Sequence, residues 1–339
     1  MKYEEIIKNN CEKYSKISWW PNYAFHCTDV RNAVSILDLE RLFSRQFANL
    51  LGVMKNDNAS RQVIDMTRSD TTAHVRFYFR PHTPTQYYNE GFKHSALRYD
   101  NDPMANMPVP VFFVFDLAKL LKMPGVQFSE RGQAGYGSIL HQGEDAFEKL
   151  NFEKIYDNGF SSKEDLAYRH AEILYPNSFD IDTCLKAIVC RNHIERITLL
   201  NLLKNKNVKA YKKYSNKIQL RSDMFENNGL FIRDYQYHGN VMSFHFSDTL
   251  QKKRYIERMM KKNNVEKLDP VEALIKIYWV KDNETLYMSE VEFQIDYLNQ
   301  TAVSFIIPDK NADSMLSRVY FEEKEMCVIE QTLVESELV

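Results

Sequence analysis

The spacing of apolar and polar residues predicts an alternation of helices and strands through the first 205 residues. Apolar side chains three and four positions apart indicate helices, whereas strict alternation or short continuous apolar runs indicate strands. Helices are expected at 3–15, 30–39, 116–122 and 194–203, and strands at 23–26, 74–79, 109–115 and 185–190. The run VPVFFVF at 109–115 is typical of a strand buried on both faces, so we place it in the central sheet.

The composition changes after residue 203, where the basic stretch KNKNVKAYKKYSNKIQLR begins. We interpret 206–222 as a basic linker between a catalytic domain at 1–205 and a smaller accessory domain at 223–339. In the accessory domain, strands are expected at 230–236, 241–246, 275–280, 285–295 and 302–307, with a basic helix at 251–262. The acidic last residues are expected to fray. The fold class is therefore α+β, with an additional smaller α+β domain at the C-terminal end.

A long glycine-containing stretch separates two of the predicted strands. It runs from Gln127 to Asp165 and holds half of the ten glycines in the chain. A long irregular segment inside a compact domain is usually functional or disordered. Here it leads directly into the sequence AYRHAEILYP, which contains Glu172.

Charge and cysteine content narrow the class of protein. The formal net charge is −2, so any nucleic-acid surface has to be a local basic patch. The five cysteines are scattered and form no zinc-ligand spacing, which favours a reducing cytosol and no metal. No run approaches the roughly 18 apolar residues of a membrane span. We therefore expect a cytoplasmic protein that does not enter a membrane.

Glu172 lies among apolar residues, where a buried carboxylate costs free energy unless a partner offsets it. The local pattern leaves two interpretations open. One is a core salt bridge with Arg169 or another neighbour, and the other is a catalytic carboxylate.

Three segments occur in a specific order along the chain: Phe25-His26-Cys27-Thr28 with Asn32, RFYFRPHTPTQYYNEG at 76–91, and RHAEILYP at 169–176. Each alone is uninformative, since a single His or Arg at a strand end is most often structural. In this order they resemble the DarT family of nucleic-acid ADP-ribosyltransferases, with FYFRPHTPTQYYNEG as the most specific piece. The resemblance covers roughly residues 20–195 and leaves the last third of the chain uncovered.

The resemblance implies a split-sheet ADP-ribosyltransferase fold with NAD+ bound in a cleft. It places His26, Thr28 and Asn32 among the NAD-binding residues, with the first two at the nicotinamide end. It also implies that residues 128–171 form the family's variable loop, which contacts the target base. Tyr136, which stands between two glycines, is a candidate to stack on that base.

One departure concerns the family's arginine. Many relatives have an arginine directly after the proline of the aromatic strand, whereas this chain has His82 there and Arg80 just before that proline. Both residues are candidates to approach NAD. We favour Arg80, also as a catalytic residue beside Glu172, because a permanently charged guanidinium binds phosphate at any pH. His82 would act when protonated or as a neutral donor.

The implied reaction explains the need for a carboxylate. Breaking the bond between nicotinamide and ribose develops positive charge on the sugar, and Glu172 is suited to stabilise that charge. The accepting base must lose a proton, and either Glu172 or the Arg80 region is a candidate general base.

The stretch 204–221 interleaves lysines with tyrosines, a combination suited to binding a flexible strand. We select Lys212, Lys213 and Tyr214 as nucleic-acid-binding candidates. The alternative is a solvated surface linker, and the helix expected at 251–262 has the same two interpretations.

Several functions remain open. The first is transfer of ADP-ribose from NAD+ to a base of single-stranded DNA, with RNA as a close variant. The alternatives are protein-directed ADP-ribosylation, NAD hydrolysis and a catalytically silent nucleic-acid-binding module. By resemblance the chain would be a bacterial toxin or anti-phage effector. Its partner would then be an antitoxin, such as a macrodomain that removes ADP-ribose, or a chaperone.

Overall fold

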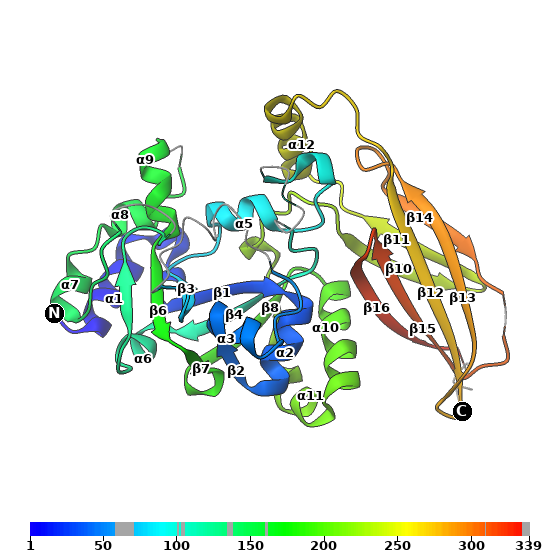
Figure 1. The fold of residues 1–339 in the computed structure, drawn as a ribbon, viewed down its shortest axis with the longest axis horizontal. Helices are drawn as coiled ribbons and strands as arrows, with labels where there is room; N and C mark the ends of the chain where they lie inside the picture. Colours follow the sequence, from blue (N-terminus) through cyan, green and yellow to red (C-terminus); the bar gives the residue numbers. More distant parts are fainter. Residues whose placement is uncertain are drawn as a thin grey trace.

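The protein is described from a computed structural model that covers residues 1–57, 71–99, 102, 106–133, 138–159, 162–308 and 310–333. Figure 1 shows two bodies side by side: a sheet surrounded by helices, and a group of long strands from the C-terminal third of the chain. Helix α5 lies over the sheet of the first body, and helix α12 stands above it at the top of the view. The last residues, expected to fray, lie outside the described residues.

The helices of the described residues are α1 (Tyr3–Lys13), α2 (Val30–Leu39), α3 (Arg45–Leu50), α5 (Pro84–Asn89), α6 (Leu117–Leu121), α7 (Glu144–Glu148), α8 (Phe152–Ile155), α9 (Lys163–Leu166), α10 (His193–Lys206), α11 (Val208–Tyr214) and α12 (Leu250–Asn263). The strands of the first body are β1 (Tyr23–Asp29), β2 (Arg41–Phe43), β3 (His74–Tyr78), β4 (Pro110–Asp116), β5 (Gln127–Ser129), β6 (Glu172–Pro176), β7 (Ser178–Asp180), β8 (Leu185–Cys190) and β9 (Ile218–Leu220). The strands of the second body are β10 (Ile232–His238), β11 (Val241–Phe246), β12 (Val271–Lys281), β13 (Glu284–Ile295), β14 (Ala302–Ile306), β15 (Ser314–Phe321) and β16 (Lys324–Thr332). All the helices and strands expected in the first 205 residues are present, with ends shifted by a few positions.

A seven-stranded sheet forms the core of the first body, in the order β5-β6-β3-β1-β4-β8-β9. Neighbouring strands are antiparallel except for the parallel pair β8 and β9. Strand β4 lies inside this sheet and six of its seven residues are buried, as its continuous apolar run predicts. The sheet brings β6, β3 and β1 together, although β6 begins about a hundred residues after β3 in the sequence.

A tight connection joins β1 to α2. The Asp29 carboxylate caps the helix by accepting a hydrogen bond from the backbone N–H of Arg31 at 3.0 Å. Helix α2 ends at Glu40, which adopts the left-handed conformation with φ of 54°. The cap fixes where β1 ends, and so positions the residues of its second half.

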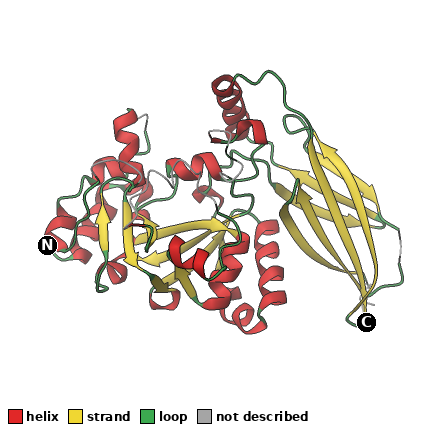
Figure 2. Ribbon diagram, in the orientation of Figure 1, coloured by secondary structure: helices red, strands yellow, loops and turns green. Residues whose placement is uncertain are grey.

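The second body is a sandwich of two sheets, β10-β11-β14 and β13-β12-β15-β16, with the single long helix α12 beside it (Figure 2). The rings of Phe293 and Phe305, from different sheets, lie 5.0 Å apart. The strands expected up to residue 307 are confirmed, and so is the helix at 251–262. Strands β15 and β16 were not expected from the sequence.

The stretch interpreted as a basic linker has regular structure. Helix α10 continues to Lys206, α11 follows, and β9 pairs with β8 as the edge strand of the seven-stranded sheet, with Ile188 opposite Ile218. Residues 206–222 therefore belong to the first body, and the basic composition of the segment reflects its exposed helix faces.

Candidate active site

Glu172 is the first residue of β6, and its side chain is 3 % exposed. Its Oε1 lies 3.8 Å from Nη1 of Arg76. Among the described residues, Oε2 has no hydrogen-bond partner. Burial raises the pKa of Glu172 above its ordinary value, while the charge of Arg76 and the backbone of Gln133 act in the opposite direction. Glu172 is thus a buried carboxylate with one weak charge partner and one oxygen that has no hydrogen-bond partner among the described residues.

Tyr78 lies directly opposite Glu172 across the β3–β6 pair, and opposite Phe25 on β1. Burial first, and then the neighbouring charge of Glu172, raise the pKa of the Tyr78 phenol well above its usual range. The phenol is therefore neutral and cannot serve as a base at pH 7. Sequence reasoning missed Tyr78, although its place in the FYFRPHTPTQYYNEG block was a signal once β3 and β6 were paired.

Gly132, in the segment between β5 and α7, lies close to Glu172. A Cβ atom at this position would lie 3.0 Å from Cβ of His170 and 3.7 Å from Oε1 of Glu172. Glycine therefore allows the chain at residue 132 to pack closely against His170 and Glu172, where a side chain would be crowded. Burial lowers the pKa of His170 to about 4, so this ring is neutral at pH 7 and adds no positive charge there.

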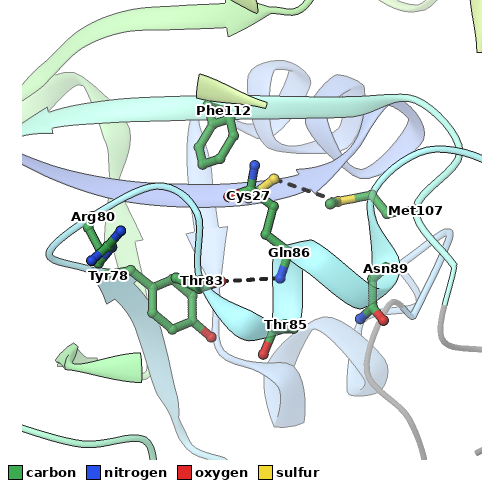
Figure 3. A pocket seen from close by; sticks show the side chains of 9 residues that line it. All are labelled: Cys27, Tyr78, Arg80, Thr83, Thr85, Gln86, Asn89, Met107 and Phe112. Atoms are coloured by element: carbon green, nitrogen blue, oxygen red, sulfur yellow. Dashed lines mark hydrogen bonds between the residues drawn. The ribbon is translucent and has the colours of Figure 1, made fainter. Parts of the chain in front are cut away.

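A pocket opens on the face of the sheet that carries Tyr78 (Figure 3). Its lining residues come from β1, β3, β4, the turn after β3, α5 and the loop before β4: Cys27, Tyr78, Arg80, Thr83, Thr85, Gln86, Asn89, Met107 and Phe112. Burial raises the pKa of the Cys27 thiol well above its usual range, so the thiol stays protonated and is a poor nucleophile. The pocket combines an aromatic and sulfur-bearing wall with hydroxyl and amide groups on α5, a lining suited to an organic ligand with polar groups.

Arg80 lines this pocket, yet its guanidinium is bound elsewhere. It donates to four oxygens, the carbonyls of Pro81 (3.0 Å), Ile155 (3.0 Å) and Asp157 (2.5 Å) and Oδ1 of Asn158 (2.6 Å). The residue is 1 % exposed, and its guanidinium carbon lies 5.1 Å from the Trp20 ring centroid. Four of the five N–H donors of an arginine are thereby used. The expectation that Arg80 binds phosphate thus conflicts with its hydrogen bonds, which hold the 155–158 segment.

His82 has a left-handed backbone, with φ of 60°, and both ring nitrogens face acceptors. Nδ1 lies 3.1 Å from Oε1 of Glu226, and Nε2 lies 2.9 Å from the carbonyl oxygen of Asp223. Burial alone would lower the pKa of His82, but the hydrogen bond and charge of Glu226 and the Asp223 carbonyl together raise it. This geometry fits an imidazolium that donates from both nitrogens. His82 is not among the residues that line the pocket.

His26 lies next to Phe25 on β1, so strand alternation turns its side chain to the face opposite Glu172 and Tyr78. Its ring centroid lies 6.3 Å from that of Phe77 and 6.4 Å from that of Phe113. Nδ1 is 2.9 Å from the backbone carbonyl of Arg76, so Nδ1 carries the proton and Nε2 is an acceptor. His26 therefore contacts the backbone of Arg76, the residue whose guanidinium lies 3.8 Å from Glu172.

Thr28 and Asn32 lie together at the start of α2. Nδ2 of Asn32 lies 3.2 Å from Oγ1 of Thr28 and donates to the Asn56 carbonyl at 2.6 Å. Its Oδ1 accepts from the backbone N–H groups of Lys55 and Asn56. Asn32 thus closes the 55–56 loop onto the start of α2. Contact of His26, Thr28 and Asn32 with NAD stays a prediction.

The residues selected for nucleic-acid binding are placed less favourably. Tyr214 is fully buried and donates from its hydroxyl to Asp182 at 3.0 Å, so it cannot stack on a base. Lys213 pairs with Glu40 at 2.8 Å and with Asp182. Lys212 is exposed. Tyr136 lies outside the described residues.

Glu90 binds the segment at residues 226 and 227, through which the chain passes from the first body to the second. This carboxylate is fully buried and accepts from the backbone N–H groups of Glu226 (2.8 Å) and Asn227 (2.9 Å). It also accepts from Nε2 of Gln86 at 2.6 Å and from Nη1 of Arg191 at 3.3 Å. Glu90 therefore holds the turn that presents Glu226 to His82. No local sequence pattern signals that Glu90 binds residues 226 and 227.

Two further features concern what the site can hold. In the part of the chain that the structure describes, no group of three His, Cys, Asp or Glu side chains is arranged to bind a metal ion. No helix among the same residues has the length and apolar character needed to cross a membrane.

Comparison with known proteins gives a family. The family model DarT, described as ssDNA thymidine ADP-ribosyltransferase, matches residues 25–225. DarT from Thermus sp. 2.9 in complex with ADP-ribosylated ssDNA is 16 % identical with a TM-score of 0.49, over 60 % of this chain and 96 % of that one. The same protein in complex with NAD+ has a TM-score of 0.47 at 16 % identity, over 60 % and 98 % of the two chains. DarTG from Thermosipho africanus in complex with ADP-ribose is 12 % identical with a TM-score of 0.46, over 64 % and 53 %.

A search of curated proteins found no match. The family model spans more than half of the chain and contains Glu172, Tyr78 and the pocket. The protein belongs to the DarT family of NAD+-dependent ADP-ribosyltransferases.

Proposed function

We propose that this protein transfers ADP-ribose from NAD+ to a thymine base in single-stranded DNA. The bond between nicotinamide and ribose breaks, a bond forms between that ribose carbon and a ring nitrogen of the base, and the base loses one proton. Nicotinamide leaves as the neutral product. The observation that carries the proposal is the buried Glu172 carboxylate with an unpartnered Oε2, inside the region that matches the family.

Glu172 stabilises the positive charge that develops on the ribose. A carboxylate in a site of low polarity interacts more strongly with such a charge than an exposed one would. The backbone at Gly132 packs closely beside this carboxylate. The 3.8 Å separation from Arg76 leaves much of the negative charge of Glu172 unneutralised.

Glu172 is also the best candidate for the general base. Its raised pKa makes it a stronger base than an ordinary carboxylate. Two other titratable groups are less suitable: the Tyr78 phenol holds its proton, and His82 donates from both nitrogens. Arg80 acts as a positioning residue, because its guanidinium holds the 155–158 segment.

The test uses labelled NAD+ and the full chain with four separate acceptor pools: single-stranded DNA, duplex DNA, RNA and protein. We expect label on single-stranded DNA, and none when Glu172→Gln replaces the wild type. A single strand of DNA without thymine serves as the control acceptor and should stay unlabelled. Transfer to RNA or protein alone would overturn the proposed acceptor, and labelling by Glu172→Gln at the wild-type rate would overturn the role of Glu172.

A silent nucleic-acid-binding function is the second candidate. It is favoured by His82, which stands in place of the family's arginine and is tied to Glu226 and Asp223. Under this alternative the wild type binds NAD+ and single-stranded DNA but labels none of the four pools.

We also propose that the protein acts as a toxin with a paired antitoxin, by likeness to its family. Induced expression in a bacterial host should arrest growth, and expression of Glu172→Gln at the same level should not. Equal growth of both strains would contradict the toxin role.

A further inference from the structure

A cluster of aromatic rings and cations lies where α5 meets α12, outside the site described above. It consists of Tyr87, Tyr88, Tyr99, Arg258 and Lys262, and we refer to it as the tyrosine–cation patch. The ring centroids of Tyr88 and Tyr99 lie 4.8 Å apart, and those of Tyr87 and Tyr88 lie 5.2 Å apart. All three tyrosines are half-buried, so part of each ring faces solvent.

The two cations of the patch are held against the tyrosines. The guanidinium carbon of Arg258 lies 5.4 Å from the Tyr87 ring centroid, and its Nη2 donates to the Tyr88 hydroxyl at 3.4 Å. Nζ of Lys262 lies 4.7 Å from the Tyr99 ring centroid. Both cations are exposed, and within the described residues neither forms an ion pair with a carboxylate. Their charge is therefore available to an anion.

Three lysines of the segment selected for nucleic-acid binding from the sequence differ in this respect. Lys213 pairs with Glu40 and Asp182, Lys206 lies 3.6 Å from Asp38, and Lys204 lies 3.3 Å from Glu330. Lys209 and Lys212 on α11 are exposed and, within the described residues, form no ion pair either. The tyrosine–cation patch differs from these two lysines because its cations lie against aromatic rings.

The patch is fixed relative to the first body, although its cations come from the C-terminal part of the chain. The buried Tyr255 donates from its hydroxyl to the Leu97 carbonyl at 3.0 Å. Nδ2 of Asn263 donates to the Ala96 carbonyl at 2.9 Å. These bonds dock both halves of α12 onto the 95–97 turn.

The patch adjoins the pocket through α5. This short helix carries Gln86 and Asn89, which line the pocket, and between them Tyr87 and Tyr88. The pocket and the patch thus share one short helix, with Gln86 and Asn89 toward the pocket and Tyr87 and Tyr88 in the patch.

We propose that the tyrosine–cation patch binds the single-stranded DNA that flanks the accepting base, an inference that rests on the proposed function. Half-buried rings beside cations that have no carboxylate partner match unstacked bases alternating with phosphates. Duplex DNA fits less well, since its bases are stacked on each other and not free to lie on tyrosine. The patch would make α12, which lies beyond the family match, part of the substrate-binding surface.

The test measures binding of a fluorescent oligothymidine to the full chain by anisotropy, at several salt concentrations and without NAD+. The double variant Arg258→Glu with Lys262→Glu should raise Kd at least about tenfold and reduce the slope of log K against log salt by about 1.4. Tyr99→Leu should weaken binding about fivefold or more and leave the slope unchanged, because it removes stacking and no charge.

The matched control is Lys209→Glu with Lys212→Glu, which makes the same charge change on exposed positions of α11. It should change Kd less than about twofold. Thermal unfolding and NAD+ affinity of every variant should equal those of the wild type. Equal weakening by both double variants, no weakening by the α12 variant, or tighter binding of single-stranded RNA through the same residues would each overturn the inference.

This assay separates the inference from the proposed function, because it needs no catalysis. A wild type that binds oligothymidine through the patch but transfers no label would refute the transferase acceptor and leave the binding surface intact. If the α12 variant transfers label to DNA as fast as the wild type, the proposed binding surface is refuted and the proposed transferase function stands.

Discussion

Oε1 of Glu226 lies 3.1 Å from Nδ1 of His82, a residue 144 positions earlier in the chain. The other ring nitrogen faces the carbonyl oxygen of Asp223 at 2.9 Å. A position where the family often has a permanent cation is thus occupied by a histidine whose surroundings favour the protonated form. The carboxylate that supports it comes from just beyond the family match.

Glu226→Gln should lower the pKa of His82. The wild-type pKa is raised above the ordinary 6.5, mainly by Glu226 against the effect of burial, and an amide keeps a contact but no charge. NMR titration of the His82 ring should show the charged form lost at lower pH in this variant. The exposed carboxylate of Glu323 provides the control, since Glu323→Gln should leave the titration unchanged. An unchanged His82 pKa in Glu226→Gln would contradict the pairing.

Glu172→Gln should reduce transfer of ADP-ribose by about 10²- to 10³-fold or more, since it removes one preorganised charge from the transition state. NAD+ affinity should change little, because the effect is on charge that develops during reaction. The measurement is single-turnover transfer beside equilibrium binding of NAD+. A variant that loses NAD+ binding and transfer in parallel would indicate a ground-state contact instead.

The same substitution should stabilise the protein at pH 7. Because the folded-state pKa of Glu172 is raised above 4.5, folding is penalised once the carboxyl group ionises, and the penalty grows as pH rises through that pKa. Glutamine cannot ionise, so the variant does not have this penalty. Thermal melts should therefore give Glu172→Gln a higher Tm than wild type at pH 7, and the difference should vanish below pH 4.5. If Glu172→Gln is less stable than the wild type at pH 7, the attraction between Glu172 and Arg76 must exceed the free-energy cost of burying the Glu172 charge.

Arg80→Lys should destabilise the fold by about 2 kcal/mol, because an ammonium cannot reproduce the four-oxygen arrangement around the guanidinium. Urea unfolding measures this. If Arg80 positions the 155–158 segment, the loss of stability should exceed any rise in KM for NAD+. A large rise in KM with unchanged stability would instead support phosphate binding by Arg80, as expected from the sequence.

Glu90→Ala should cost about 3 kcal/mol or more of unfolding free energy. It leaves the buried Arg191 with one fewer carboxylate and removes the acceptor of two backbone N–H groups. Glu90→Gln should cost less, as it retains an acceptor oxygen. Urea unfolding of the two variants, compared with Glu323→Gln, checks the order.

Local pattern was sufficient for the longer helices and for β1, β3, β4 and β8 of the first body, but not for its short elements or for β6, which begins with Glu172. Strand β4 is identified by its apolar run, and the start of α2 by the capping residue Asp29. Both signals lie within a few consecutive residues, so they can be recognised without knowledge of the fold. Strand β9 was missed because it is three residues long and reads as part of a lysine-rich stretch. Strands β15 and β16 were missed although both carry local signals, alternate burial along β15 and an apolar run at 326–329 in β16. The acidic residues that follow β16 suggested a chain end that frays.

The site was predictable only in part, for a different reason. Glu172 stands out locally, as a carboxylate among apolar residues. The partners that decide the roles of Arg80 and His82 do not, since Asp157 and Glu226 are brought in by chain segments 77 and 144 positions away. Tyr214 was misjudged because an aromatic residue among lysines suggests stacking, whereas its ring fills the core and its hydroxyl binds Asp182.

The bonds made by Glu90 bear on how such a protein can be cut or recombined. The family match ends at residue 225, and the two backbone groups that Glu90 binds belong to residues 226 and 227. A recombinant fragment trimmed to the family boundary would leave this carboxylate in the interior without two of its donors. Gene fusions that replace the C-terminal sandwich would therefore need to carry the 226–227 turn with the transferase half.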